Sequence, residues 1–270
     1  MPKIVTGSMP VDNGNLIIEY NDLDYFLQYE PEAKKYVYPF LGAEEFINNK
    51  KRYCLWLKDF PLDEIKKFPL IEERVESVKN FRLTSNKVKT RAAATTPNLF
   101  QEIRQPNTNY LAIPKTSSER RFYIPIGFIS NSVICSDALR IVPDATIYHF
   151  GILTSSIHMA WVRAVAGRLK SDYRYSASIV YNNFVWCSPS GRQRRRIEET
   201  AQEILKVRAD FEDWTYAKLY DEATMPKNLR DAHKENDMAV ALAYGFESLL
   251  EDEGRIVAEL MKLYKALTSG

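Results

Sequence analysis

The stretch ALRIVPDATIYHFGILTSSIHMAWV, residues 138–162, contains the change from strand to helix that decides the fold. From Tyr110 to Val142, near the start of this stretch, short runs rich in β-branched and aromatic residues alternate with Ser, Asn and Pro clusters, which predicts a sheet of several strands. From about Ile147 the apolar residues return at helical spacing, and Gly167 ends the helical run. These two patterns together indicate strands followed by packed helices.

Towards the amino terminus the patterns are shorter. Residues 1–21 are rich in Gly, Asn and Pro without a period, which favours an extended arm or connection. Short helical patterns follow between Asp22 and Asn49, and Tyr53–Asp59 alternates like a strand. A long helical pattern begins at Leu70, and its polar continuation brings several cations close together in sequence: Arg82, Lys87, Lys89 and Arg91.

Towards the carboxyl terminus, the segment YSASIVYNNFVW, Tyr175–Trp186, predicts a final strand. After Pro189 the chain is expected to be helical to its end, with helices over roughly 192–209, 226–244 and 251–267. We therefore predict an α+β fold, in which a small, mostly antiparallel sheet with packed helices is followed by a C-terminal helical subdomain. The expected divisions are 1–21, 22–188 and 189–270.

Composition excludes several classes of protein. The longest apolar stretches are interrupted by His, Ser and Thr and are too short to span a membrane, and no signal-peptide pattern opens the sequence. We expect a globular, cytoplasmic protein without a membrane partner. Cys54, Cys135 and Cys187 are odd in number and scattered, which is typical of reduced, buried thiols and of neither a disulfide framework nor a zinc site.

Charge is distributed unevenly along the chain. Residues 1–79 carry 11 basic and 14 acidic residues, residues 80–196 carry 17 and 5, and residues 197–270 carry 9 and 16. The middle segment is thus strongly positive between two negative ones, and most of its cations are Arg, which suits bidentate contact with phosphate. This pattern favours a surface for a polyanion, although a solvated lysine- and arginine-rich surface would give the same counts.

Motifs for catalysis are absent from the sequence. The 10 glycines are dispersed without a GxGxxG or GxxxxGK[ST] motif, no GxSxG occurs, and the 3 histidines form no spaced metal-binding pair. His149 and His158 lie in an apolar run and are interpreted as core residues. Asp59 with Glu64 and Lys66 resembles a nuclease motif, but its context favours a capped surface helix. We expect no catalytic residue, cofactor site or metal site in this chain.

Several long blocks closely resemble the region that follows the catalytic domain in MmeI-like (type IIL) restriction–modification DNA adenine methyltransferases. The blocks are GAEEFINNKKRYCLWLKD, EIRQPNTNYLAIPKTSSERRFYIPIGF, YHFGILTSSIHMAWVRAVAGRLKSDYRYS, IVYNNFVW and TMPKNLRDAHKENDMAV. The resemblance covers nearly the whole chain. One departure is that the family pattern NNFPWP has Val185 and Cys187 here in place of its two prolines.

The resemblance implies that this chain is the target-recognition and C-terminal part of a longer protein, or begins at an internal Met of one. The catalytic domain, its Asn-Pro-Pro-Tyr/Phe motif and S-adenosylmethionine would then lie upstream, and the implied partners are double-stranded DNA and that catalytic domain. Two rival interpretations remain. The acidic C-terminal helices suit a protein-interaction module that docks on the catalytic domain, and a small nuclease is the other alternative.

The resemblance also implies which residues read bases. In the family, the two positions flanking the serine of GRLKSDYRYS help to specify the base pair beyond the target adenine, and here they are Lys170 and Asp172. A lysine can donate to guanine O6 and N7 and an aspartate can accept from the cytosine amino group, so together they could read one G·C pair. Without the resemblance, a surface salt bridge between them would be the simpler interpretation.

Other cations and polar residues of the basic middle segment, residues 80–196, are candidates for contacts to the DNA backbone. The candidates are Lys89, Arg91, Lys115, Ser117, Ser118, Arg120, Arg121, Arg168, Tyr173 and Arg174. The aromatic residues further along are interpreted as core side chains and not as a base-stacking platform: Trp161, Tyr175, Tyr181, Phe184 and Trp186. Asn182 and Asn183 could bond adenine edges or form a turn.

Overall fold

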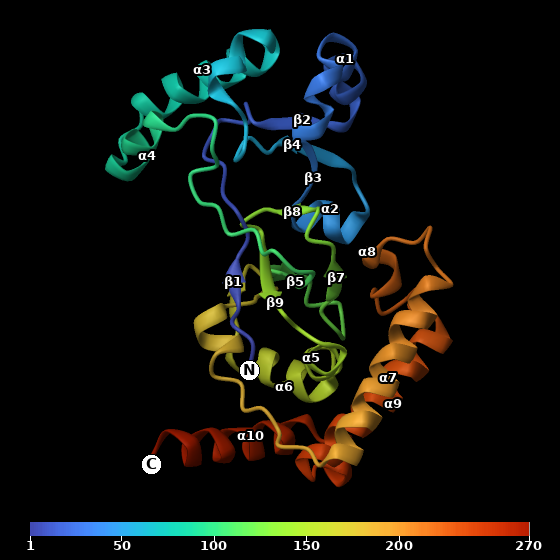
Figure 1. The fold of residues 1–270 in the computed structure, drawn as a ribbon. Helices are drawn as coiled ribbons and strands as arrows, with labels where there is room; N and C mark the ends of the chain where they lie inside the picture. Colours follow the sequence, from blue (N-terminus) through green and yellow to red (C-terminus); the bar gives the residue numbers. More distant parts are fainter. Residues whose placement is uncertain (270) are drawn as a thin grey trace. The chain divides into compact units, whose positions relative to one another are not determined.

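The protein, in a computed structural model that describes residues 1–269, divides into two compact units (Figure 1). Unit 1 contains residues 1–5, 108–129 and 140–270, and unit 2 contains residues 6–107 and 130–139. Each unit is assembled from segments that are distant in the sequence. The α+β prediction is confirmed, with small, mostly antiparallel sheets and a helical C-terminal region.

Unit 2 is built on a sheet with the strand order β2-β4-β3-β8. The strands are β2 (Ile17–Glu19), β3 (Val37–Leu41), β4 (Arg52–Leu55) and β8 (Ile134–Cys135). β4 pairs antiparallel with both β2 and β3, whereas β3 and β8 are parallel. The helices of this unit are α1 (Leu23–Tyr29), α2 (Ala43–Asn48), α3 (Pro69–Leu83) and α4 (Val88–Ala92), with 3-10 turns at Tyr20–Asp22, Pro31–Tyr36, Leu62–Lys67 and Ala93–Thr95.

The N-terminal segment differs from an irregular arm. Val5–Thr6 forms β1 and Ile17–Glu19 forms β2, and the Leu16 and Ile18 side chains are fully buried in the core of unit 2. Asp12 accepts hydrogen bonds from the Gly14 and Leu16 amides at 3.2 and 2.6 Å and so stabilises the turn before β2. The Gly, Asn and Pro content reflects these turns, and the apolar residues between them supply core contacts.

Unit 1 contains a sheet with the strand order β1-β9-β5-β7. Its strands are β1 (Val5–Thr6), β5 (Tyr110–Pro114), β7 (Gly127–Ile129) and β9 (Leu139–Pro143), and all five residues of β5 are buried. The predicted single helical run after Ile147 is two helices, α5 (Ile147–Leu153) and α6 (Ser156–Val165). The break occurs because the Ser155 side chain accepts from the His158 amide at 3.2 Å and starts a new helix.

A second sheet of unit 1 has the order β10-β11-β6, with β6 (Thr116–Ser117), β10 (Gly167–Leu169) and β11 (Asp172–Arg174). The strand predicted over Tyr175–Trp186 is wrong, because Ala177–Tyr181 is a π-helix followed by an irregular segment. The Ser176 hydroxyl accepts from the Ile179 amide, and the Val180 carbonyl accepts from the Trp161 indole N–H at 2.9 Å. The backbone groups of this segment therefore bond to a nearby serine and to Trp161, and not to a neighbouring strand as its β-branched residues would favour.

The C-terminal helices are α7 (Gly191–Ala209), α8 (Tyr216–Leu219), α9 (Lys227–Tyr244) and α10 (Glu253–Thr268), with a 3-10 turn at Glu247–Leu249. α7 and α9 run side by side (Figure 1), and the Thr200 hydroxyl donates to Asn236 between them. Their apolar faces share one core with the strands of unit 1, so the expected division at residue 188 does not coincide with the boundary between the compact units. Within residues 1–269, no helix has the length and apolar character needed to cross a bilayer.

Candidate nucleic-acid interface

The segment between Gly167 and Arg174 forms a tight β-hairpin. β10 pairs antiparallel with β11, with Leu169 opposite Asp172, so the connection has only two residues, Lys170 and Ser171. The backbone of Lys170 is left-handed, with φ of +56°. A two-residue turn requires such a conformation, which Gly or Asn adopts most easily, so a lysine there is held at some cost in strain.

The two faces of the hairpin differ in exposure. Because side chains alternate along a strand, Leu169 and Asp172 share one face with Arg174, while Arg168 and Tyr173 share the other. On the first face Leu169 is 56% exposed, Arg174 is exposed and Asp172 is half-buried. We call this face, together with Lys170 in the turn, the outer face of the hairpin. It offers one anion, two cations and an apolar side chain to solvent.

The other face is turned inward, and it removes two residues from the expected set of DNA contacts. Tyr173 is only 5% exposed and belongs to the core of unit 1, and Ser117, its partner on β6, is 2% exposed. Neither side chain is accessible to a phosphate. The β alternation that turns Asp172 and Arg174 outward buries Tyr173 between them, so Tyr173 and Ser117 support the hairpin from inside, and we do not retain them as proposed DNA contacts.

Arg168 folds back across the hairpin. Its guanidinium carbon lies 4.0 Å from the centroid of the Tyr173 ring, and its Nη1 donates to the Ser171 carbonyl at 3.1 Å. One side chain thus contacts both the inner strand and the turn. Arg168, on β10, is thus in contact with Ser171 and Tyr173, which lie on the other side of Lys170 in the hairpin.

The loop after β6 brings three further predicted residues together. Ser118 begins a turn in which its carbonyl accepts from the Arg121 amide at 3.2 Å, and Arg120 forms an ion pair with Asp221 at 3.5 Å. Arg121 is half-buried, and its Nε has no hydrogen-bond partner in the part of the chain that the structure describes. Burial lowers the pKa of Arg121, while the nearby charges of Asp172 and Asp221 act in the opposite direction. Asp172 is therefore in the electrostatic field of Arg121.

Lys115 precedes β6, and its carbonyl accepts from the Tyr175 amide at 2.8 Å, which joins the loop to the chain leaving the hairpin. The structure therefore gathers the unit 1 candidates around one small sheet: Lys115, Ser118, Arg120, Arg121, Arg168, Lys170, Asp172 and Arg174. Sequence reasoning did not anticipate the hairpin, because Lys-Ser is not a typical two-residue turn and carries no Gly or Asn signal.

The cations of unit 2 have different roles. Arg82 is fully buried and donates to five backbone carbonyls at 2.7–3.0 Å, those of Pro10, Val11, Ala93, Thr96 and Leu99. Arg82 is therefore separated by burial from the exposed cations that follow it in the sequence. Lys89 and Arg91 on α4 are exposed; Lys89 pairs with Glu102 at 2.5 Å, and Arg91 donates to the Ser85 carbonyl at 2.7 Å.

The aromatic residues that follow the hairpin lie in the core. Trp161, Tyr175, Tyr181 and Phe184 are each at most 4% exposed, which confirms their interpretation as core residues, and Trp186 packs against the same cluster. His158 is also buried, with Nε2 2.9 Å from the Tyr175 hydroxyl, and burial lowers its pKa to about 3. His149 is half-buried at the start of α5 and bonds Thr146. The Cys54 and Cys135 thiols are buried, and Cys187 is half-buried.

A buried polar network in unit 1 gave no sequence signal. Asp237 on α9 accepts from the Tyr123 hydroxyl at 2.6 Å and from the Ser156 amide at 2.7 Å, and His233 stacks on the Tyr123 ring. Tyr220 links His233 to Arg208, whose Nη1 donates to the Ile126 carbonyl. Burial raises the pKa of Asp237 to about 7. The network joins α9, α6 and the loop before β7.

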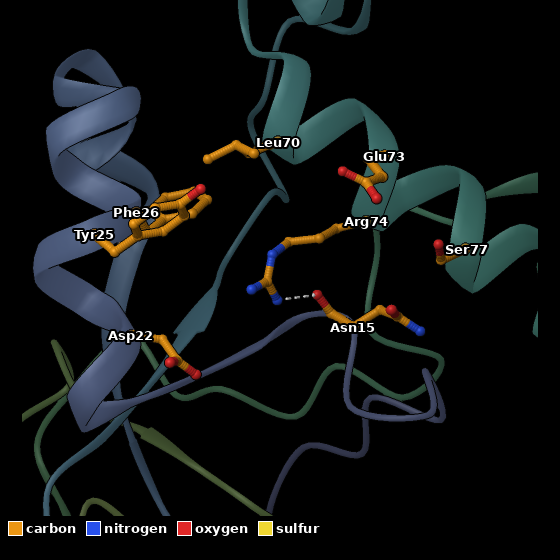
Figure 2. A pocket seen from close by; sticks show the side chains of 8 residues that line it. All are labelled: Asn15, Asp22, Tyr25, Phe26, Leu70, Glu73, Arg74 and Ser77. Atoms are coloured by element: carbon orange, nitrogen blue, oxygen red, sulfur yellow. Dashed lines mark hydrogen bonds between the residues drawn. The ribbon is translucent and has the colours of Figure 1, made fainter.

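Unit 2 contains a cavity of about 390 Å³ between α1 and α3, shown in Figure 2. Its central cation, Arg74, donates to the carbonyls of Asn15 and Ile17 at 2.9 and 3.0 Å and lies 5.8 Å from the Phe26 ring centroid. Asp22 and Glu73 also line it. Because the guanidinium already bonds backbone carbonyls and the remaining charges are acidic, this cavity does not suit a polyanion. Residues 1–269 also lack any cluster of His, Cys, Asp or Glu that could hold a metal ion.

Comparison with protein families gives the class of protein to which this α+β fold with its short charged hairpin belongs. Residues 1–188 match the family model described as the MmeI target recognition domain, and residues 189–270 match that of the MmeI C-terminal domain. The chain therefore belongs to the MmeI family, with a target recognition domain followed by the family's C-terminal domain.

Two relatives extend this result. DNA methyltransferase A of Bacillus subtilis (strain 168) is 41% identical over 268 residues, which are 99% of this chain and 30% of that protein. The solved structure of the type IIL restriction–modification enzyme MmeI in complex with DNA matches with a TM-score of 0.97 and 44% identity, over 100% of this chain and 36% of that chain. The chain thus spans about a third of the length of the relatives it matches.

Proposed function

We propose that this chain is the sequence-specific, double-stranded-DNA recognition module of a DNA adenine methyltransferase in a restriction–modification system. The observation that carries the proposal is the outer face of the hairpin, where Lys170 and Asp172 flank one serine at the tip of an exposed two-residue turn. Membership in a target-recognition family and likeness to an enzyme solved in complex with DNA support the same conclusion.

The chemistry of the two side chains suits one G·C pair. The Lys170 ammonium can donate to guanine O6 and N7, and the Asp172 carboxylate can accept from the amino group of the paired cytosine. A β-hairpin is narrow enough to enter the major groove, where each base pair presents a distinct pattern of donors and acceptors. Lys170 makes no hydrogen bond or ion pair within the described chain, so the surface salt bridge has no support from geometry.

Phosphate contacts would set the register of the duplex. In unit 1 the accessible candidates are Arg120, Arg174 and, with partial burial, Lys115, Ser118 and Arg121; in unit 2 they are Lys89 and Arg91. Several of them already have an intramolecular partner, such as Asp221 for Arg120 and Glu102 for Lys89. These pairs keep the cations soluble and oriented before a phosphate replaces the carboxylate.

Methylation itself would take place elsewhere in a longer cytoplasmic protein. A methyltransferase flips its target base into a catalytic pocket, so a separate module must hold the flanking duplex. The glycines of this sequence are dispersed and form no nucleotide-binding motif, so we assign S-adenosylmethionine to the catalytic domain, which is also the proposed protein partner. Calorimetry on the isolated chain should detect no binding of this cofactor; micromolar binding would contradict the assignment.

The decisive test reverses the polarity of the two proposed readers in the full-length protein. Lys170→Glu with Asp172→Arg should transfer preference from G to C on the strand that carries the methylated adenine, as mapped by sequencing methylated sites. Each single change should cost about 1–3 kcal/mol, because one base edge then faces a mismatched partner. If the double variant still methylates the original site, these residues do not read it.

A second measurement separates DNA recognition from a protein-interaction role. The affinity of the chain for a random duplex should fall with salt, with a slope of log affinity against log salt of roughly −0.9 per phosphate contact. A flat profile would favour the interaction module, whose acidic helices would bind the catalytic domain.

A further inference from the structure

We propose that Arg168 is a positioning residue that holds the Lys170–Ser171 turn in its base-reading conformation, and that it is not a phosphate contact. This inference rests on the proposed function of the hairpin and deepens it. Sequence reasoning placed Arg168 among the backbone contacts because of its charge. Its contacts within the molecule assign it a different role.

The turn needs an external restraint. Lys170 has a φ of +56°, a region that costs a residue with a Cβ of the order of 1 kcal/mol. β10 is an edge strand of a small sheet, and all three of its residues are exposed, so little burial fixes the hairpin from that side. Without further contacts, the tip would relax towards a more common turn and carry the Lys170 ammonium away from Asp172.

Arg168 supplies contacts at both required points. The guanidinium carbon lies over the Tyr173 ring, 4.0 Å from its centroid, and Tyr173 is anchored in the core. From that position Nη1 donates to the Ser171 carbonyl at 3.1 Å, within the turn itself. The Arg168 side chain thus connects the turn to the core of unit 1. Lys170, the left-handed residue, lies in the sequence between Arg168 and the Ser171 carbonyl that Arg168 bonds.

The planar shape of the side chain matters as much as its charge. A guanidinium can stack on a ring through its face while its edge donates to a carbonyl, whereas a lysine ammonium presents a hydrated point charge. Arg168→Lys therefore preserves charge and phosphate attraction but removes the restraint. This variant separates the two roles that a charge-removing substitution would confuse.

The experiment compares variants of the full-length protein in competition binding between two duplexes that differ only in the G·C pair assigned to Lys170 and Asp172. The variants are Arg168→Lys, Arg168→Gln, Lys170→Gln, Tyr173→Phe, and Arg120→Gln as the phosphate-contact control. We expect both Arg168 variants to reduce discrimination between the duplexes by about fivefold or more, towards the level of Lys170→Gln. Their salt slopes should equal that of the wild type, whereas Arg120→Gln should reduce the slope, by less than about 0.9 because a phosphate must replace Asp221 at Arg120. Tyr173→Phe keeps the ring and should keep discrimination.

Amide hydrogen exchange in the DNA-free protein provides an independent readout. In both Arg168 variants the amide protons of residues 167–174 should exchange faster than in the wild type, while the exchange rates in β5 and α7 should not change. If Arg168→Lys retains full discrimination while Lys170→Gln loses it, the positioning role is overturned and the base readers stand. If Arg168→Gln lowers the salt slope with discrimination intact, Arg168 is a phosphate contact. If Lys170→Gln keeps discrimination, the assignment of Lys170 and Asp172 as base readers fails. If, in addition, amide exchange within residues 167–174 is unchanged in the Arg168 variants, Arg168 does not restrain the turn either.

Discussion

The segments 82–91 and 167–174 are both cationic in the sequence, with net charges of +4 and +2, and they differ in how the structure places their cations. In the first, Arg82 is fully buried and bonds five carbonyls, while Lys89 and Arg91 remain at the surface of α4. In the second, Lys170 and Arg174 are exposed on a hairpin whose inner face is anchored by Tyr173. The comparison teaches that a run of cations is not one surface: helix and strand periodicity distribute its members between core and solvent.

The two segments differ in the hydrogen-bond acceptors that are available to their cations within the molecule. A buried arginine is tolerated where its five N–H groups all find acceptors, and Arg82 meets that condition with backbone oxygens only. Its acceptors come from the N-terminal segment and from the chain after α4, so it joins parts of unit 2 that are far apart in sequence. On the hairpin, Lys170 and Arg174 make no ion pair in the part of the chain that the structure describes, and they are available to a ligand.

The largest expected effect follows from removing this buried guanidinium. Arg82→Met should lower the free energy of unfolding by more than about 3 kcal/mol, because several buried carbonyls lose their donor at once. The matched control is Arg91→Met on the surface of α4, which should change it by no more than about 0.5 kcal/mol. Urea denaturation of both variants measures the difference. Equal, small effects would mean that the two arginines are interchangeable and would break the comparison.

The fold could be predicted further than the site. Long amphipathic patterns such as 192–209 and 226–244 gave helices close to α7 and α9, because each helix needs one continuous apolar face. The hairpin could not be predicted, since its register depends on Tyr173 entering the core and on Lys170 adopting a left-handed conformation that lysine rarely selects alone. For the same reason Tyr173 and Ser117 were expected at the DNA surface: the sequence shows their polarity, and only the pairing of β11 with β6 shows their direction.

A buried anion in unit 1 extends the contrast between buried and exposed charge. The pKa of Asp237 is raised to about 7 from an ordinary value of 3.8, so the folded state favours the protonated form. Its contribution to stability is therefore full below about pH 3.8 and is lost as the pH rises to about 7. Asp237→Asn is neutral at every pH and should gain stability relative to the wild type between pH 5 and 7, with no further gain above pH 8.

Thermal unfolding of both proteins at several pH values tests this prediction, and the difference between them removes contributions from other groups. The matched control is Asp231→Asn on the exposed face of the same helix, where Lys227 lowers the pKa of the carboxyl group. Its difference from the wild type should be constant across the same range. A constant difference for Asp237→Asn would show that its hydrogen bonds from Tyr123 and Ser156 cancel the effect of burial, so that the pKa of Asp237 is the same in the folded and unfolded states.

A smaller effect is expected from Arg121, whose burial is intermediate between that of Arg82 and that of the exposed hairpin cations. It is half-buried, and Asp172 is one of the two acidic groups that favour its charged form. Asp172→Arg places a second cation in that field, which should destabilise unit 1 by up to about 1 kcal/mol and weaken the altered specificity of the polarity-reversed variant. Adding Arg121→Gln should recover part of both losses. A double-mutant cycle in urea denaturation, with Arg120→Gln in place of Arg121→Gln as control, would detect no coupling if the two side chains act independently.

The smallest expected effect concerns the exposed cations that already have partners. Lys89 pairs with Glu102, whereas Arg174 makes no ion pair in the described part of the chain, so a phosphate that reaches Lys89 must replace a carboxylate. Lys89→Gln should leave the stability within about 0.5 kcal/mol of the wild type, because exposed ion pairs contribute little. On a random duplex it should reduce the salt slope by less than Arg174→Gln does, for which the full reduction of about 0.9 is expected. Glu102→Gln is the companion variant, since it frees Lys89 and also Arg104, which pairs with the same carboxylate. It should raise affinity at low salt if α4 contacts DNA, and adding Lys89→Gln should then remove the gain. If Glu102→Gln and Lys89→Gln both leave the affinity and the slope unchanged, Lys89 does not contact the duplex, and Arg91 is the remaining candidate on α4.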